Sequence, residues 1–566
     1  MSDDDIWDVG ADVVVVGSGA AGFAAAFAAR QAGASVLIVE KAGYLGGTTA
    51  KSGAYFWLPG NHLLRDRGLV DDRDQALRLM ARLSYPQSYV PDDELLGLTR
   101  LEHDLLAAFF DNAGPALQAM ADCGAFKPDL DMTMPDYCAD LPEDTLPYGR
   151  HVFPDGWVSQ NDIIAGRGVA DGSTRGEFMI AEFERQARLL GIEIRTEHEA
   201  VRLITDAGSD DTDDAEGTDG PVVLGLELHH RTRTVLARAR KAVVFASGGF
   251  AHNPDMRRQF LRGPVFGGCA AESATGDFVT IAGEVGAQLG NMSNAWWSQT
   301  PLEMVFAHPS TVRDVFMPFG DSMVLVNRFG KRVVNEKMVY NERSQVHFAW
   351  DATHREYANL LLFQVYDDAV AQSDFDFPYR VPVPLPGESV GYVVSGDTID
   401  DLAAALDARL AQLVDRTGGV RLADGFAEQL RATIARFDAF AESGVDEDFG
   451  RGGTPIQQAW NGPPRRADMA NPTMHPFAAT GSYHAIILGP GMLDTKGGPR
   501  IDDRARVLDV RGQPISGLYG AGNCIASPAG QAYWSAGATL GVALTFGYIA
   551  GRAAASEPVK AFGGES

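Results

Sequence analysis

Three glycines and one acidic residue near the beginning of the sequence have the types and spacing needed to bind a nucleotide. Gly17, Gly19 and Gly22 stand in the order G-x-G-x-x-G, and Glu40 follows roughly 20 residues later. In such a loop the first glycine makes a tight turn, the second admits a pyrophosphate to the backbone, and the third lets a helix pack closely on a strand. The acidic side chain can accept a hydrogen bond from a ribose hydroxyl. The pattern predicts a dinucleotide site and leaves NAD and FAD both open.

The residues around these glycines predict the strand, helix and second strand that must position them. Residues 13–16 are four valines, which is typical of a strand buried on both faces. The alanine-rich residues 23–31 predict a helix that Gly33 ends, and residues 35–39 predict the second strand. The N-terminus of that helix would direct free N–H groups and the positive end of its dipole at the phosphates.

The composition is that of a globular protein and excludes several partners. The chain has 566 residues, of which 45% are hydrophobic and 22% charged, and its net charge is −27. Because nucleic acid and anionic membranes repel this charge, we expect neither as a partner. The four cysteines contain no C-x-x-C pair, so we expect no disulfide framework and no metal site. An acidic start without a secretory leader, and the lack of a long apolar run, predict a cytoplasmic protein with no integral membrane segment.

The order of these patterns predicts an α/β protein, in which a Rossmann-like domain carries an inserted domain of α+β type. A change to more aromatic residues and longer helices marks the insertion, and a glycine-rich stretch marks the return to the first domain. The predicted segments are residues 1–301, with a helical part at 62–125 and a substrate-side loop at 126–160, residues 302–487 as the catalytic cap, and residues 488–566 as the return. The acidic residues 209–220 predict a solvated hairpin tip.

Motifs along nearly the whole chain resemble, in their order, those of the fumarate reductase/succinate dehydrogenase flavoprotein superfamily. They are the opening glycines, GGTTAKSGA, ASGGF, ATGDFVTIAGEVGA, VNRFGKRVVNE and GLYGAGN. The resemblance implies FAD, an FAD-binding domain and a capping catalytic domain, with Glu40 on the adenosine ribose. The histidine that binds flavin covalently in succinate dehydrogenases has no counterpart in GGTTAKSGA, so we expect noncovalent FAD. The cofactor-binding residues expected on this basis are Gly17, Gly19, Ala20, Ala21, Gly22, Glu40, Lys41, Gly47, Thr48, Thr49, Ser52, Gly53, Ala246, Ser247, Gly248, Gly522, Asn523, Thr539 and Leu540.

Two positions depart from the fumarate reductases within this superfamily. Their proton-donating arginine corresponds to Tyr340, the fifth residue after Asn335 of the N-E motif. Their substrate-binding histidine, in an H-T-M-G-G motif, corresponds to Asp494. Both residues that would handle a dicarboxylate are therefore absent.

Other motifs are similar to those of the 3-ketosteroid dehydrogenase branch, which removes two hydrogens from adjacent ring carbons beside a ketone. They include NAWW, TKGG, the tyrosine of N-E-x-x-x-Y and the PDY that ends at Tyr137. The resemblance implies that Tyr533 and the backbone N–H of Gly537 polarise the ketone. It also implies that Tyr340, hydrogen-bonded to Tyr137, is the base.

The turn that contains Tyr533 leaves the position of desaturation open. Δ1-type enzymes read Y-P-G-P-G where this chain reads Y-W-S-A-G. A serine two residues after the tyrosine resembles the Δ4-(5α) enzymes, in which Tyr533 would be the base and Ser535 its helper. Trp534 could also narrow the pocket, as would suit a single-ring ketone.

Taken together, the resemblance predicts an FAD-dependent dehydrogenase of a cyclic ketone, with a 3-ketosteroid as the first choice and an unknown electron acceptor. The alternatives are a cyclohexanone-type dehydrogenase, a fumarate-reductase-like reductase and a flavin-binding protein without turnover.

Overall fold

The computed structural model describes residues 6–156, 174–206, 221–310, 315–373, 380–461, 465–466 and 468–560. The acidic residues 209–220, predicted to form a hairpin tip, lie outside this part of the chain, as do residues 157–160 of the predicted substrate-side loop.

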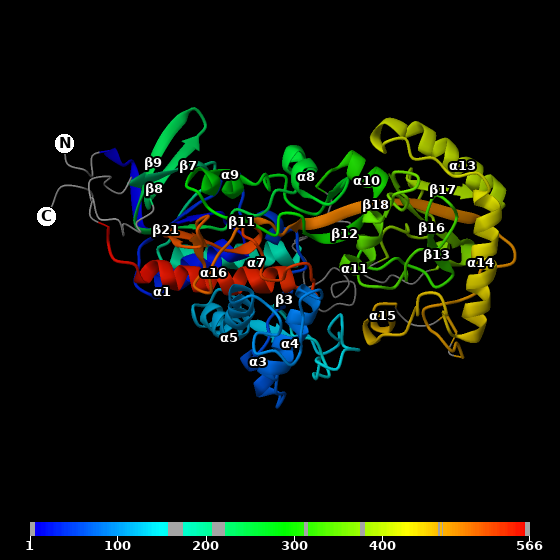
Figure 1. Ribbon diagram of the computed structural model, residues 1–566, viewed down its shortest axis with the longest axis horizontal. Helices are drawn as coiled ribbons and strands as arrows, with labels where there is room; N and C mark the ends of the chain where they lie inside the picture. Colours follow the sequence, from blue (N-terminus) through cyan, green and yellow to red (C-terminus); the bar gives the residue numbers. More distant parts are fainter. Residues whose placement is uncertain are drawn as a thin grey trace.

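An eight-stranded sheet carries the predicted nucleotide-binding motif (Figure 1). Its strands are β1 (Val9–Val16), β2 (Val36–Val39), β6 (Glu193–Arg195), β7 (Glu199–Asp206), β8 (Val222–His230), β9 (Arg233–Phe245), β20 (Arg506–Leu508) and β21 (Pro514–Gly520). The order is β20-β21-β9-β1-β2-β6, and β8 pairs with both β7 and β9. β1 runs parallel to β2 and β9, so that Val14 pairs with Leu37 and Val243. Valines 13–15 are fully buried, as expected of a strand covered on both faces.

Two helices that are far apart in the sequence lie side by side against this sheet (Figure 1). They are α1 (Ala20–Gln31) and α16 (Ala538–Ser556). Glycines of α16 allow the close approach, because a Cβ atom at Gly547 would lie 2.4 Å from the carbonyl oxygen of Ala21. At Gly551 a Cβ atom would lie 2.1 Å from that of Ala25. The two helices therefore pack backbone against backbone.

We expect Gly551→Ala to destabilise the protein, although alanine is the better helix former. In an open helix this change stabilises by about 1 kcal/mol, whereas forced overpacking costs about 1–3 kcal/mol. Gly283→Ala is the matched control, since Gly283 lies in α9 (Asp277–Glu284) with nothing within 4 Å of its added Cβ atom. Urea denaturation should show a lower midpoint for Gly551→Ala only. An unchanged or higher midpoint would mean that the helices separate without cost.

A second sheet of six strands lies at the other end of the molecule (Figure 1). Its strands are β10 (Gly267–Gly268), β12 (Ala295–Pro301), β13 (Met323–Val326), β16 (Leu362–Asp367), β17 (Val393–Gly396) and β18 (Tyr483–Thr495). α13 (Ile399–Gln412) and α14 (Phe426–Ser443) pack their apolar side chains into the core of this end. β18 crosses from this sheet towards the first one and ends beside the nucleotide-binding motif. β10 and β12 precede residue 302 and yet pair with β18 in this sheet. The division of the chain at residues 301 and 487 stays a prediction.

A third group of elements flanks the first sheet below α16 in Figure 1. It consists of α3 (His62–Asp66), α4 (Arg73–Ser84), α5 (Arg100–Asp122) and the small sheet of β3 (Phe56–Trp57), β4 (Pro128–Leu130) and β5 (His151–Pro154). The remaining helices and strands of the described residues are α2 (Gly47–Ala50), α7 (Arg175–Leu189), α8 (Pro254–Phe260), α10 (Leu302–Ala307), α11 (Tyr340–Ser344), α12 (Asp368–Ala371), α15 (Pro455–Ala459), β11 (Leu289–Gly290), β14 (Trp350–Asp351), β15 (Glu356–Tyr357) and β19 (Gly498–Pro499).

The predicted mixed α/β class is confirmed. Among the described residues, no helix has both the length and the apolar character to cross a bilayer.

Candidate active site

A cavity of about 960 Å³ extends from the glycine loop after β1 to a group of aromatic side chains. This volume lies at the upper end of the range for ligand sites. All the predicted cofactor-binding residues except Gly22 line it. Four of the five predicted catalytic residues line it too, and only Ser535 does not. Lining residues that were not predicted include Lys51, which lies within GGTTAKSGA, and Tyr55, Met134, Arg175, Cys269, Phe316, Trp460 and Leu493, which belong to none of the quoted motifs.

The glycine loop has the geometry of a phosphate-binding turn. Gly17 adopts φ +103°, and a Cβ atom there would lie 2.4 Å from the carbonyl oxygen of Ala246. At Gly22 a Cβ atom would lie 2.0 Å from the carbonyl oxygen of Gly17. Gly22 therefore permits contact between helix and strand and lies behind the cavity wall. The residues present fit a dinucleotide. Glycines leave bare backbone at this part of the cavity, so a pyrophosphate can approach N–H groups that larger side chains would cover.

Glu40 lines the cavity and is held by the glycine loop. Its Oε2 atom accepts hydrogen bonds from the backbone N–H of Ser18 at 3.1 Å and from the Ser18 hydroxyl at 2.7 Å. Its Oε1 atom accepts from the backbone N–H of Ala42 at 2.9 Å. A carboxylate has about four acceptor positions, and these three bonds leave one of them free on Oε1. Glu40 therefore shapes the loop and retains capacity for a ribose hydroxyl.

Glu40→Gln should weaken FAD binding by about 10- to 100-fold, because hydrogen bonds to a charged group contribute roughly 1.5–3 kcal/mol. Titration of the apoprotein with FAD, followed by quenching of flavin fluorescence, measures the change. Glu199→Gln is the control, since Glu199 is exposed and lies outside the cavity wall. Equal affinity of Glu40→Gln and the wild type would show that the carboxylate serves neither loop nor ribose.

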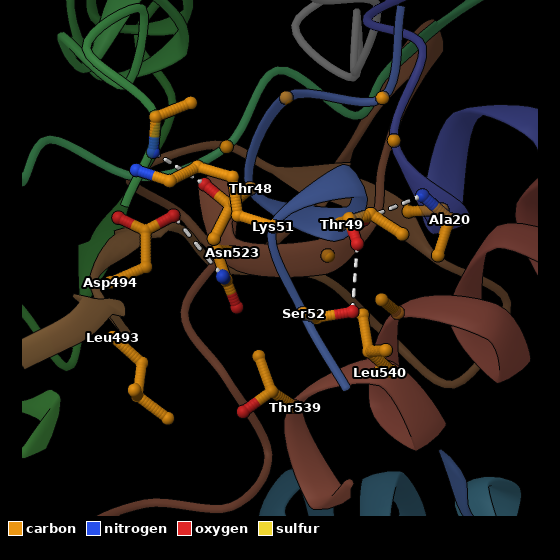
Figure 2. A pocket seen from close by; sticks show the side chains of 18 of the residues that line it. Ala20, Thr48, Thr49, Lys51, Ser52, Leu493, Asp494, Asn523, Thr539 and Leu540 are labelled. Carbon is orange, nitrogen blue, oxygen red and sulfur yellow. Dashed lines mark hydrogen bonds between the residues drawn. The ribbon is translucent and has the colours of Figure 1, made fainter. Parts of the chain in front are cut away.

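Figure 2 shows the part of the cavity between α2, the end of β18 and the start of α16. The Thr49 hydroxyl accepts from the backbone N–H of Ala20 at 3.1 Å. The Asn523 amide donates to Asp494 at 3.1 Å. Burial raises the pKa of Asp494 to about 6. Lys41, predicted to contact the cofactor, is paired with Asp277 at 2.7 Å at the cavity wall.

Three buried tyrosines from separate parts of the chain meet at the other end of the cavity. The Tyr137 hydroxyl donates to the Tyr340 hydroxyl at 3.0 Å. The Tyr533 ring stacks on Tyr137 at 5.8 Å and meets the edge of Tyr340 at 5.2 Å between ring centroids. Tyr340 therefore stands where a fumarate reductase has an arginine, and it contacts two other tyrosines.

Burial raises the pKa of the Tyr340 hydroxyl well above its usual value, and the neighbouring tyrosines reinforce the effect. Burial also raises the pKa of Tyr533, although the Thr539 hydroxyl, Tyr340 and the backbone N–H of Gly537 oppose this shift. Both side chains are therefore neutral phenols near pH 7. A phenol of raised pKa is a strong base once its proton has left.

Gly537 begins α16 in a conformation that other residues avoid. Its φ is +83°, and a Cβ atom there would lie 2.4 Å from the carbonyl oxygen of Tyr55. Its own carbonyl oxygen accepts from the backbone N–H of Trp57 at 3.0 Å. This turn brings the first free N–H groups of a helix to the cavity beside Tyr533.

The prediction that Trp534 narrows the pocket is wrong. Its side chain points into the core, where it stacks on Phe109 at 5.2 Å and donates to the Ser84 hydroxyl at 3.0 Å. The wall is formed instead by Trp460, whose ring meets Tyr137 edge-on at 5.2 Å. Residues adjacent in sequence on an extended turn face opposite ways, which explains the error.

The role of helper to Tyr533, predicted for Ser535, does not agree with its contacts. Its hydroxyl is fully buried and accepts from the backbone N–H of Tyr137 at 3.2 Å. The same oxygen lies 2.7 Å from Nε2 of His151. Ser535 therefore connects the loop of Tyr137 to β5, and neither contact reaches the Tyr533 hydroxyl.

Comparison with known proteins agrees with this geometry. A family model described as an FAD binding domain matches residues 12–540. The chain is 32% identical to a 4-oxocyclohexanecarboxylate 2-dehydrogenase from Sinomonas cyclohexanicum, over 96% of this chain and 93% of the relative. It is 30% identical to a 3-oxosteroid 1-dehydrogenase from Mycolicibacterium smegmatis, over 95% of this chain and 96% of the relative.

A solved structure has a similar fold over nearly the whole chain. It is a 3-ketosteroid Δ1-dehydrogenase from Sterolibacterium denitrificans in complex with 1,4-androstadiene-3,17-dione. The TM-score is 0.78 at 25% identity, and the match covers 97% of this chain and 99% of the other. The resemblance drawn from the motifs is confirmed. The chain therefore belongs to the FAD-binding oxidoreductase family that includes these dehydrogenases, and FAD is its cofactor.

Proposed function

We propose that the protein introduces a C=C bond next to the carbonyl of a cyclic ketone. The observation that carries the proposal is the group of Tyr137, Tyr340 and Tyr533 beside Gly537, in one cavity with the FAD-binding residues. When bound, FAD supplies the acceptor for a hydride from the β-carbon. The tasks left to the chain are to hold the ketone and to remove the α-proton.

The Tyr533 hydroxyl and the Gly537 N–H are the donors suited to the ketone oxygen. This oxygen gains negative charge as the α-proton leaves, and one well-placed donor contributes about 3 kcal/mol to the transition state. Tyr340 first loses its own proton to solvent, and the Tyr137 hydroxyl stabilises the phenolate that this leaves through the 3.0 Å hydrogen bond. The phenolate then takes the α-proton and becomes a neutral phenol again. Because Ser535 is bonded to His151 and to the Tyr137 backbone, its contacts favour Tyr340 over Tyr533 as the base.

We propose a 3-ketosteroid as the substrate, on the similarity to the 3-oxosteroid and 3-ketosteroid 1-dehydrogenases. A single-ring ketone is the second candidate, and one observation favours it. A relative at 32% identity is named for an oxocyclohexane carboxylate.

Anaerobic mixing of the oxidised holoprotein with a panel of ketones tests this proposal. Loss of flavin absorbance with a 3-ketosteroid, and identification of a 1-ene product, are the expected results. Bleaching by cyclohexanones alone would select the single-ring candidate. Oxidation of the reduced protein by fumarate would select the reductase alternative, and no response to any ketone would leave only a flavin-binding protein.

A further inference from the structure

The hydroxyl of Ser535 lies between two parts of the chain behind the cavity. Its oxygen accepts the backbone N–H of Tyr137 at 3.2 Å and lies 2.7 Å from Nε2 of His151. Ser535 and His151 are both fully buried, and neither lines the cavity. The reaction proposed above uses neither residue.

This contact holds Tyr137 in a segment that has little regular structure. It lies between β4 and β5, in a stretch of turns that follows Leu130 and ends at His151. Its backbone N–H is bonded to the Ser535 side chain rather than to another backbone group. The ring is packed against Tyr533 and Trp460. The serine hydroxyl is thus a polar contact that helps to set how far Tyr137 reaches into the cavity.

His151 is in turn held by a buried charged cluster. Its Nε2 atom lies 3.3 Å from the Asp136 carboxylate. The same carboxylate accepts from the indole N–H of Trp57 at 2.9 Å and from the Arg150 guanidinium at 2.5 Å. Arg150 is also paired with Asp71 at 2.8 Å. Burial lowers the pKa of His151, so its ring is neutral and acts as a hydrogen-bonding partner of Ser535.

We propose that Ser535 and His151 are positioning residues that place the Tyr137 hydroxyl against Tyr340. This inference rests on the proposed function, because it assigns Tyr137 the task of assisting the base. Ser535 acts through the Tyr137 backbone, and His151 acts by fixing the orientation of the Ser535 hydroxyl. Loss of either contact frees the Tyr137 backbone N–H while the neighbouring Asp136 stays bound to Trp57 and Arg150. Tyr137 then shifts, and the 3.0 Å bond between the two phenols lengthens.

The first experiment is a double-mutant cycle with Ser535→Ala and Tyr137→Phe, measured over a range of pH. Ser535→Ala should lower kcat about tenfold, with FAD content and KM nearly unchanged, and should move the alkaline limb of the kcat/KM profile in the same direction as Tyr137→Phe. In the Tyr137→Phe background, Ser535→Ala should have no further effect on kcat. Losses that add fully in the double variant, or a wild-type profile in Ser535→Ala, would overturn the inference.

A pair of His151 variants provides a second test. His151→Gln keeps a donor and acceptor near Ser535, whereas His151→Leu has neither. We expect His151→Leu to reproduce the kcat and pH profile of Ser535→Ala, and His151→Gln to retain most of the wild-type activity. Ser84→Ala is the control, because it removes the 3.0 Å hydrogen bond to Trp534, next to Ser535, without touching Tyr137. Equal activity of the Leu and Gln variants would exclude a role for the ring nitrogen.

A crystal structure of Ser535→Ala separates this inference from the proposed function. If no ketone reduces the wild-type flavin, the proposed function fails, yet the distance between the Tyr137 and Tyr340 hydroxyls can still be compared. A separation beyond about 3.5 Å in the variant is the expected result. A hydrogen bond of unchanged length would overturn the positioning role by itself.

Discussion

Tyr340→Phe should lower kcat by about 10²- to 10⁴-fold while FAD stays bound, since this is the usual contribution of a general base. The variant keeps the ring that packs against Phe316 and Tyr533 and removes only the oxygen that faces Tyr137. Stopped-flow measurement of flavin reduction isolates the step. Tyr44→Phe is the control, because the Tyr44 side chain is exposed and does not line the cavity. Unchanged reduction in Tyr340→Phe would eliminate Tyr340 as the base.

The pH dependence provides an independent check on the same residue. Burial raises the pKa of Tyr340 well above its usual value, and the reactive form is the deprotonated one. Below that pKa its fraction grows tenfold per pH unit, so kcat/KM should rise through the neutral range without a plateau. If kcat/KM instead stops rising above about pH 7, the base is a carboxyl group. Asp494, whose pKa burial raises to about 6, is the candidate in the cavity wall.

Tyr533→Phe should lower kcat by about 10²- to 10³-fold, because it removes one of two donors to the charge that forms on the ketone oxygen. The Gly537 N–H remains in place, since Gly537 is held by its own bond to Trp57. Some activity should therefore survive, and the loss should be smaller than that of Tyr340→Phe.

The ranking of these two variants decides the type of desaturation. If Tyr533→Phe is the more damaging, then Tyr533 is the base and the reaction is of the Δ4 type. Analysis of the product of one steroid incubation by mass spectrometry and NMR gives the position of the new double bond. A 4-ene product with a nearly active Tyr340→Phe variant would reverse the roles proposed for the two tyrosines.

The parts of the site that depend on backbone geometry could be read from the sequence. The spacing of Gly17, Gly19 and Gly22 restricts the chain to one turn, and the residues that follow have the periods of a helix and a strand. The catalytic tyrosines could be placed only through family motifs, since phenols are common in protein cores. Their proximity arises from contacts between distant segments, on which local spacing has no bearing.

The two predictions that the structure does not support, for Trp534 and for Ser535, failed for the same reason. Which way a side chain points in an irregular turn depends on what surrounds the turn, and Trp534 is buried between α4, α5 and β3. Trp460, which does form the wall, follows α15 in a segment without a motif. The partner of Ser535 is Tyr137, and no pattern in the sequence connects two residues so far apart.

The pairing of α1 with α16 has a consequence for synthesis of the protein. α1 ends at Gln31 and α16 begins at Ala538. A ribosome that adds about 5–20 residues per second needs roughly 25–100 s to make the chain between them. Throughout that time the nascent α1 lacks α16, which covers one of its sides, and the cavity lacks Gly522, Asn523 and Thr539 from its wall. The complete FAD-binding site therefore forms only after translation has passed α16.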